Sequence, residues 1–259
     1  MADSTVKVLQ IPPEGIEMQD KPFAIGGFGE VYKAKWRHRN VVVKVIKTLD
    51  EEKEEVMQEA NMTFRLRHPN VVDLLGITQV KSWQLGIVME EAEQGSLYVW
   101  IGYMNQDQLT KVALGIVFGL EYVHSAKVIH RDIKPKNVLM FGPKYHMIPK
   151  LADFGAAKIV ERTTKNTKVG EDYYMAPEVG ERQYGFPADI FSLAVTMFEM
   201  FNEQLISEAP VEVKRSVSNG RIPKNCKVPA YLRNVIERGF NRNPKLRPAL
   251  SEYCSTLHG

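Results

Sequence analysis

The chain has 259 residues, of which 44% are hydrophobic and 25% are charged, a composition typical of a globular protein with a substantial core. Lys and Arg number 34 against 31 Asp and Glu, so the formal net charge of +3 gives no strong field that would favour nucleic acid or an anionic membrane. Two cysteines are too few for a disulfide framework and favour a reduced, cytoplasmic protein. No apolar run reaches the roughly 20 residues of a membrane span. We therefore expect neither a nucleic-acid partner nor a membrane span.

The first part of the chain is expected to form a small sheet with one helix. Residues 1–19, which include Pro12 and Pro13, have the composition of an extension or linker. Residues 51–66 are rich in Glu, Met, Ala and Leu and stop shortly before Pro69, which cannot continue a helix. Short runs of β-branched or alternating apolar residues predict strands. These runs are residues 31–35, 41–46 and 84–89.

After a polar stretch at residues 90–95 the chain is expected to be mainly helical. Residues 109–124 are apolar nearly all round and should be buried, whereas residues 188–200 and 230–238 have one apolar face each. Between these helices, residues 128–185 form a long irregular stretch dense in His, Asp, Lys, Asn and Gly. Irregular segments of that length in compact domains are usually functional or disordered. The pattern predicts an α+β fold with its chemistry in this stretch.

The most informative segment is residues 130–137, which read HRDIKPKN. A carboxylate such as Asp132 can accept a proton from an attacking hydroxyl. Lys134 can neutralise charge on a phosphoryl group in transfer, and Asn137 can bind a hard cation through its oxygen. The alternative interpretation is a charged surface loop, which is disfavoured because further motifs follow in the expected order.

The second motif is Asp153-Phe154-Gly155, which follows the apolar run at residues 148–152. An aspartate beside a flexible glycine, with a phenylalanine as packing anchor, suits a Mg²⁺ ligand. A third motif, Ala-Pro-Glu at residues 176–178, closes the irregular stretch.

Together these motifs, in this order over most of the chain, resemble a eukaryotic protein kinase catalytic domain. The resemblance implies a two-lobed α+β fold: a small antiparallel-sheet N-lobe with one main helix, and a larger, mainly helical C-lobe. It also implies the following boundaries: an extension at 1–19 and a kinase domain at 20–259, with the N-lobe at 20–89, the hinge at 90–95 and the C-lobe at 96–259.

The resemblance also implies a catalytic set that works with ATP and Mg²⁺. Lys44 would hold the α and β phosphates, and Glu59 on the predicted helix would position that lysine. Asp132 would be the catalytic base, while Asn137 and Asp153 would bind Mg²⁺. The full set is Lys44, Glu59, Asp132, Lys134, Asn137 and Asp153.

The nucleotide site is implied by the same resemblance. Met89 falls at the gatekeeper position, and the backbone of Glu90 and Ala92 is expected to bond the adenine edge. The expected nucleotide-binding residues are Ile25, Gly26, Gly27, Phe28, Gly29, Val31, Val42, Lys44, Met89, Glu90, Ala92, Ser96, Leu139 and Asp153.

Substrate class follows from Lys134, since its pairing with Pro135 is unusual in tyrosine kinases and points to Ser or Thr on a protein substrate. The chain is also similar to the tyrosine-kinase-like group, whose members mostly phosphorylate Ser and Thr. The Ala-Pro-Glu motif, which in the family shapes a peptide groove, disfavours a small-molecule phosphotransferase. Two structural contacts are also expected: Asp189 as the anchor of the segment around Asp132, and an internal ion pair between Glu178 and Arg247.

Regulation is indicated by Arg131, which in similar kinases meets a phosphate on the activation segment. Thr163, Thr164 and Thr167 are the candidate phosphosites, modified by an upstream kinase or by the chain itself. The alternative is that these threonines are simply polar loop residues.

Four positions depart from the family pattern. Ala24 stands where the first glycine of the glycine-rich loop is usual, and Val42 stands where alanine normally faces the adenine. Thr63 replaces an apolar residue on the predicted helix, and Glu171 replaces a threonine near the base. These departures keep open a nucleotide-binding pseudokinase that acts as a scaffold or switch. The presence of every catalytic residue type favours the active enzyme.

Overall fold

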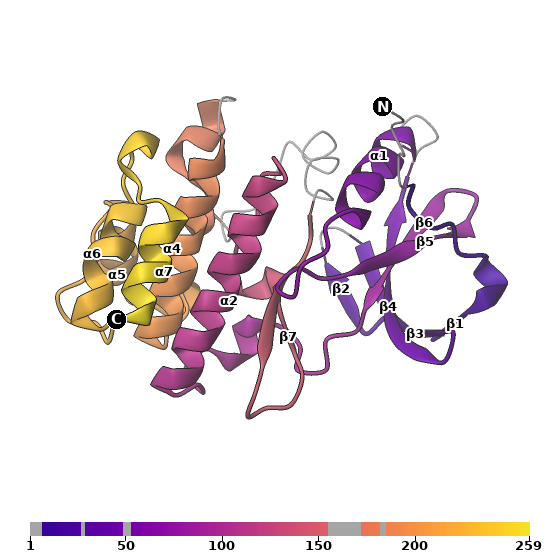
Figure 1. The fold of residues 1–259 in the computed structure, drawn as a ribbon, viewed down its shortest axis with the longest axis horizontal. Coiled ribbons are helices and arrows are strands. Elements are labelled where there is room, and N and C mark those ends of the chain that lie inside the picture. The colour runs from indigo at the N-terminus through magenta and orange to yellow at the C-terminus, as the bar shows by residue number, and fades with distance from the viewer. Residues whose placement is uncertain (1–6, 27–28, 49–52, 155–171, 182–184) are drawn as a thin grey trace. The chain divides into compact units, whose positions relative to one another are not determined.

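The computed structural model describes residues 7–26, 29–48, 53–154, 172–181 and 185–259 (Figure 1). The chain divides into two compact units, which are considered separately. Of the described residues, those from 7 to 91 and Phe154 belong to the N-terminal unit, and those from 92 to 153 and from 172 onward belong to the C-terminal unit.

The N-terminal unit is an antiparallel sheet with a helix. Its elements are η1 (Pro13–Gly15), β1 (Ile16–Met18), β2 (Ala24–Gly26), β3 (Gly29–Trp36), β4 (Arg39–Lys47), α1 (Lys53–Phe64), β5 (Leu74–Lys81) and β6 (Gln84–Glu90). The strand order is β1-β3-β4-β6-β5, and β2 also pairs with β3. The predicted strands correspond to β3, β4 and β6, and the predicted helix corresponds to α1. The sequence patterns missed β1, β2 and β5.

β4 is the central strand of this sheet, and the side chains of residues 41–46 are all buried. Val41, Val43 and Val45 join a core cluster on one face. On the other face, Ile87, which lies opposite Lys44, packs against the cluster that contains Ala60 of α1. Because cross-strand partners point to the same side of a sheet, α1 covers the face that carries Lys44.

Part of the expected N-terminal extension packs on this unit. The backbone N–H of Ile11 donates to the carbonyl of Ile77 at 2.7 Å, and the N–H of Ile77 donates to the carbonyl of Leu9 at 2.8 Å. The N–H of Val8 donates to Oδ1 of Asn61 on α1 at 2.6 Å, and Val8 and Ile11 are both buried. Residues 8–11 therefore connect β5 with α1. The boundary expected at residue 19 stays a prediction.

The C-terminal unit is mainly helical. Its longer elements are α2 (Gln106–Ser125), β7 (Val138–Phe141), β8 (Ile148–Leu151), α4 (Phe186–Asn202), α5 (Val211–Ser218), α6 (Ala230–Gly239) and α7 (Leu250–His258). Its 3₁₀ turns are η3 (Leu97–Trp100), η4 (Pro135–Asn137), η5 (Asp172–Tyr174), η6 (Pro177–Glu181), η7 (Ile206–Glu208) and η8 (Pro244–Leu246). The α+β class is confirmed.

The expectation of a single apolar face for residues 188–200 was wrong, and the burial expected for residues 109–124 holds for most of them. α4 is buried on every side from Ala188 to Asn202, because α2, α6, η5 and η8 all contact it. α2, by contrast, has an exposed side that carries Lys111, Phe118 and Glu121. The sequence of α4 is in fact apolar nearly all round, and a helix of that composition is expected to be buried on every side.

The stretch at residues 128–185 is not irregular throughout. Strands β7 and β8 form an antiparallel hairpin in which Val138 lies opposite Leu151. This hairpin places Asn137 before its first strand and Asp153 just after its second strand, so both lie at the same end of the hairpin.

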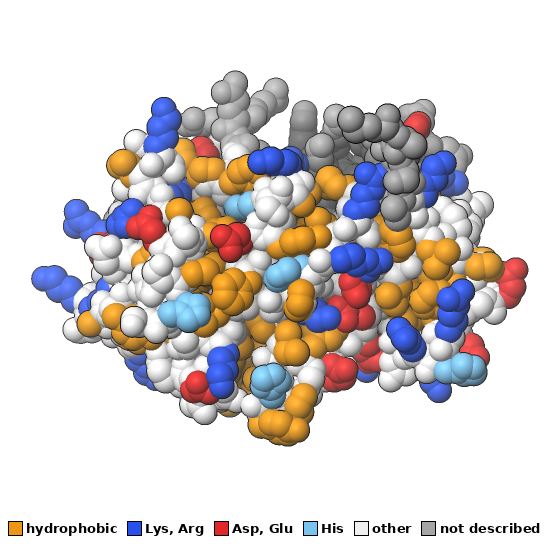
Figure 2. All heavy atoms as spheres, in the orientation of Figure 1, with side chains coloured by type: hydrophobic (Ala, Val, Ile, Leu, Met, Phe, Trp, Pro, Cys, Tyr) orange, Lys and Arg blue, Asp and Glu red, His pale blue; other side chains and the backbone are white. Residues whose placement is uncertain are grey.

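On the face shown in Figure 2, lysine and arginine side chains are interspersed with acidic ones. Within the described residues, every helix is too short or too polar to cross a membrane.

Candidate active site

The segment around Asp132 is anchored by Asp189, a fully buried carboxylate near the start of α4. Its Oδ2 accepts the backbone N–H of His130 at 2.9 Å, and its Oδ1 accepts the backbone N–H of Arg131 at 2.8 Å. The ring Nε2 of His124 on α2 lies 2.8 Å from Oδ2. A buried carboxylate that accepts these hydrogen bonds fixes the path of the loop. The contact expected for Asp189 is confirmed.

Two residues of this region hold a left-handed backbone conformation without being glycine. Arg131 has φ of 72° and Asp153 has φ of 63°. Such conformations cost energy and persist only where the surroundings impose them. At Arg131 the bond from its own N–H to Asp189 supplies that constraint.

His130 is buried beside this anchor. Desolvation lowers the pKa of its ring below the ordinary value, although Asp189, Asp132 and Asp153 oppose the shift. His130 therefore favours the neutral form and serves to shape the loop.

Asp132, the predicted base, is surrounded by two other predicted site residues. Its Oδ2 lies 3.0 Å from Nζ of Lys134 and accepts Nδ2 of Asn137 at 2.7 Å. Nδ2 of Asn137 also donates to the backbone carbonyl of Asp132 at 2.8 Å. Lys134 and Asn137 are buried, whereas the Asp132 side chain is 23% exposed. The structure thus joins a partly accessible carboxylate, an ammonium and an amide.

The orientation of Asn137 bears on metal binding. Because both bonds to Asp132 use Nδ2, the amide oxygen Oδ1 is turned away from that carboxylate. The backbone carbonyl of Asn137 accepts the N–H of Ala152, the residue before Asp153. An amide oxygen and a carboxylate at one end of a hairpin are the oxygen donors that Mg²⁺ prefers, so the donor set fits this cation.

Four of the predicted nucleotide-binding residues lie on one face of the sheet in the N-terminal unit. Val31 lies opposite Lys44 in the pairing of β3 with β4, and Val42 lies opposite Met89 in the pairing of β4 with β6. Since Val42 and Lys44 are two residues apart on one strand, all four side chains point to the same face. The Lys44 side chain is buried. Strand register alone therefore gathers these residues.

The β2–β3 hairpin carries the predicted glycine-rich loop. Ala24 lies opposite Val31, and Gly26 lies opposite Gly29. A Cβ on Gly29 would lie 2.2 Å from the carbonyl oxygen of Val45, and its φ is +126°, so glycine is required there. Ile25 is exposed.

Helix α1 carries Glu59 and Thr63. Thr63 is buried, which places a hydroxyl in the packed side of the helix. The expected ion pair between Lys44 and Glu59 stays a prediction.

The predicted adenine-edge residues belong to both units. Glu90 ends β6, where its Oε1 accepts the N–H of Asp73 at 2.8 Å. In the C-terminal unit the carbonyl of Ala92 accepts the N–H of Gly95. Ser96 forms an isolated antiparallel β-bridge with Leu139 on β7.

Several predicted positions lie outside the described residues. They are Gly27, Phe28, Thr163, Thr164, Thr167 and Glu171. The proposals about the loop tip and the phosphosites therefore rest on the sequence.

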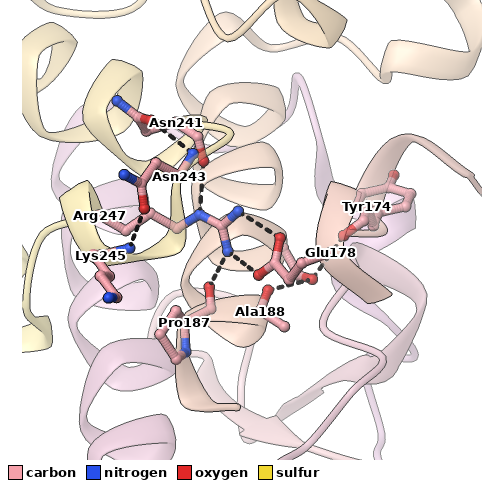
Figure 3. Close-up of polar contacts among 9 residues, drawn as sticks. Tyr174, Glu178, Pro187, Ala188, Asn241, Asn243, Lys245 and Arg247 are labelled. Atoms are coloured by element: carbon pink, nitrogen blue, oxygen red, sulfur yellow. Dashed lines mark hydrogen bonds and ion pairs between the residues drawn. The ribbon is translucent and has the colours of Figure 1, made fainter. Parts of the chain in front are cut away.

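The expected ion pair between Glu178 and Arg247 is confirmed (Figure 3). Nη2 of Arg247 donates to Oε2 of Glu178 at 2.8 Å, and the same guanidinium donates to the carbonyls of Pro187 and Asn241 at 2.7 and 2.9 Å. Burial alone would raise the pKa of Glu178, but the hydrogen bonds from Arg247 outweigh it and hold that pKa below its ordinary value. The contact ties η6 to the segment before α7.

A second buried carboxylate, Glu199 on α4, was missed by sequence reasoning. Both its oxygens accept the Tyr174 hydroxyl at 2.8 Å, and Oε1 also accepts the N–H of Ile206 at 2.7 Å. Desolvation raises the pKa of Glu199 to about 7, against the effect of these hydrogen bonds. The available signal was an acidic residue within the apolar run at residues 193–201, which indicates a buried polar contact.

The chain is similar to known proteins over most of its length. A family model described as "Protein kinase domain" matches residues 20–257. A serine/threonine-protein kinase of Arabidopsis thaliana, STY17, is 31% identical over 274 residues, which cover 96% of this chain and 47% of that protein. STY46 from the same plant is 34% identical, and mitogen-activated protein kinase kinase kinase 7 of Bos taurus is 32% identical; each alignment covers 90% of this chain and 42% of the relative. The chain spans about half the length of these relatives.

Proposed function

The chain belongs to the protein kinase family, and we propose that it is an active kinase domain that transfers the γ-phosphoryl group of ATP to a serine or threonine of a protein substrate. The observation that carries the proposal is the group around Asp132, in which Lys134 and Asn137 both contact Oδ2 of that carboxylate. The names of the relatives support the same substrate class.

Asp132 accepts the proton of the substrate hydroxyl, because it is the partly exposed carboxylate of the loop held by Asp189. Lys134 contacts that carboxylate and offsets the negative charge of the phosphoryl group during transfer. Lys44, buried on the sheet face of the N-terminal unit, binds the phosphates, and Glu59 positions it.

Asn137 and Asp153 are the residues that would hold Mg²⁺. When bound, the cation offsets the charge of the β and γ phosphates. The bonds from Nδ2 of Asn137 to Asp132 orient the amide, so that its oxygen and the proton-accepting carboxylate keep separate roles.

We also propose that the protein is cytoplasmic. The support is that Cys226 and Cys254 are both free thiols, as is usual in a reducing compartment.

The test is phosphate incorporation into a generic Ser/Thr substrate by the purified chain with Mg-ATP. We expect Asp132→Asn and Asp153→Asn each to lower the rate by about 10²-fold or more, because each removes a group that acts on the reacting phosphate or hydroxyl. Asp107→Asn is the matched control, since Asp107 is an exposed carboxylate paired with Lys111 on α2.

Mapping of the modified residues by mass spectrometry checks the substrate class and reveals any modification of Thr163, Thr164 or Thr167. If the wild-type chain incorporated no phosphate while Mg-ATP raised its melting temperature, the pseudokinase alternative would replace the proposal.

A further inference from the structure

The turn between β3 and β4 is built from residues that seldom adopt its conformation. The two residues of the turn, Arg37 and His38, have φ of 48° and 64°. Trp36 pairs with Arg39 across them, so the hairpin has a two-residue loop. Two consecutive left-handed residues are typical of a type I′ turn, in which Asn-Gly is strongly preferred because positive φ is unfavourable for most side chains. The chain therefore has a basic pair where a neutral pair would form the same turn more easily.

The tip of this hairpin concentrates positive charge. Residues 35–39 read KWRHR, so three Lys and Arg side chains and one His lie within five residues. Lys35, Arg37, His38 and Arg39 are all exposed. The formal net charge of the whole chain is only +3, and these five residues alone carry that much with His neutral. The positive charge at the tip is therefore local and is not a property of the whole surface.

Carboxylates on the neighbouring elements do not pair with the two arginines. These carboxylates are Glu17 on β1 and Glu14 in the turn before it. Glu17 lies opposite Lys35 in the pairing of β1 with β3, so it shares the face of that lysine. Within the part of the chain that the structure describes, Arg37 and Arg39 have no carboxylate partner. Their guanidinium groups can therefore bind an anion from another molecule.

Trp36 brings the two arginines to one place. The guanidinium of Arg37 lies over its ring, with Cζ 4.8 Å from the ring centroid. Arg39 lies opposite Trp36 across the hairpin, and opposite side chains start about 5 Å apart on the same face. The contact with the ring also restricts the Arg37 side chain, which reduces the entropy that binding would cost.

The chemistry of this pair favours a phosphate group on a protein. A guanidinium is planar and forms two parallel hydrogen bonds with phosphate oxygens. A phosphorylated serine or threonine carries about −1.5 to −2 charges, which two arginines match, whereas a carboxylate carries one. Binding to an anionic membrane through charge usually takes about four to eight Lys and Arg, more than residues 35–39 supply.

We propose that the tip of the β3–β4 hairpin binds a phosphorylated serine or threonine of a partner protein through Arg37 and Arg39. This binding accounts for the unfavourable turn, because Asn-Gly would relieve the backbone but would remove the charge. The site requires no phosphoryl transfer, so it goes beyond the proposed kinase function and holds whether or not the chain is active.

The experiment measures the binding of fluorescein-labelled peptide libraries to the full chain by fluorescence anisotropy. Each library has random residues around a fixed central residue, which is phosphoserine, glutamate or serine. A non-hydrolysable ATP analogue with Mg²⁺ is present throughout, so that no phosphate is transferred. We expect phosphoserine to bind about tenfold more tightly than serine, and more tightly than glutamate. The preference should shrink at high salt, because salt screens exposed charges.

The decisive variant is the double change Arg37→Asn with His38→Gly. It supplies the pair that a type I′ turn prefers, so the melting temperature should rise while the phosphoserine preference is lost. Arg39→Gln should also lose most of the preference. Lys81→Gln is the matched control, because Lys81 is an exposed lysine over the ring of Trp83 in the same unit and its change also removes one positive charge. This control should keep the preference of the wild-type chain.

The outcomes separate a phosphoprotein site from its alternatives. Absence of a phosphoserine preference, a preference that survives the double variant, or a double variant that gains no stability overturns the proposal. Equal binding of glutamate and phosphoserine also overturns it, because the tip would then recognise acidic peptides in general. Vesicles of phosphatidylcholine and phosphatidylserine are tested in parallel. If the chain sediments with them through Arg37 and Arg39 but binds no phosphopeptide, the tip is a membrane contact and the proposal is wrong.

Discussion

The two units position their predicted site residues by different physical means. In the N-terminal unit, the pairing of β3, β4 and β6 brings Val31, Val42, Lys44 and Met89 to one face, so backbone hydrogen bonds set their positions. In the C-terminal unit, the carboxylate of Asp189 on α4 holds the segment around Asp132 through two backbone N–H groups.

This difference predicts different sensitivity to mutation. The register of a sheet is fixed by many equivalent backbone hydrogen bonds, so replacing one side chain leaves most of these bonds intact. A buried side chain that serves several partners is not replaceable, because its loss leaves buried polar groups without a hydrogen bond. We therefore expect the largest single-residue effects at buried polar side chains of the C-terminal unit and smaller, local effects in the sheet.

The largest effect is expected for Arg247→Met. The change leaves the Glu178 carboxylate, whose side chain is 11% exposed, without its cation. An uncompensated charge costs about 3–5 kcal/mol where burial is complete, so we expect a loss at the lower end of that range. The measurement is the free energy of unfolding in urea at neutral pH. Arg238→Met is the matched control, because Arg238 forms a similar pair with Glu252 at the surface and should lose much less. Equal losses for the two variants would contradict the comparison.

The second effect concerns Glu199 and its dependence on pH. Its pKa is about 7 in the folded chain against an ordinary 4.5, so the folded state holds the proton more tightly than the unfolded state. The contribution of Glu199 to the free energy of unfolding is present in full below about pH 4.5. It decreases as pH rises to about 7, and the total decrease is about 3 kcal/mol.

The variant Glu199→Gln should remove this contribution and flatten the dependence of unfolding free energy on pH in that window. Glu121→Gln, at an exposed position on α2, serves as the control and should leave the slope unchanged. A slope that is the same in wild type and Glu199→Gln would show that the buried carboxyl is not the source.

The smallest of the three effects is expected in the sheet unit, for Gly76→Ala. A Cβ at this position would lie 2.6 Å from the carbonyl oxygen of Leu9 and 2.7 Å from Cδ1 of Ile11, so residues 8–11 must shift. Overpacking of this kind typically costs about 1–3 kcal/mol, and here a displaced segment relieves part of it. Hydrogen exchange at the Ile77 amide, which bonds Leu9, should become faster while exchange in β4 stays slow.

Gly15→Ala is the control for this change, because a Cβ there has no atom within 4 Å. Faster exchange throughout the sheet in Gly76→Ala would mean that residues 8–11 support the whole unit, and the contrast between the units would then be weaker than proposed.

Catalytic motifs that consist of consecutive residues could be predicted from the sequence. The segment at residues 130–137 and the Asp153 motif indicated the family, and the structure brings Asp132, Lys134 and Asn137 into contact. Alternation predicted β3, runs of β-branched or apolar residues predicted β4 and β6, and composition before Pro69 predicted α1. These signals are local, since they depend on side-chain types within one element.

Features that depend on partners distant in sequence were decided by tertiary structure. The contact of residues 8–11 with β5 and α1 has no local signature. The shifted pKa of Glu199 depends on its burial and on its contacts with Tyr174 and Ile206, which only folding brings together. The family, the class of chemistry, strands β3, β4 and β6 and helices α1, α2, α4 and α6 could be predicted from the sequence, because each of these is encoded in a short segment. Tertiary structure alone decided which side chains are buried and which charges meet, because burial and electrostatic contact depend on residues that approach each other only in the folded chain.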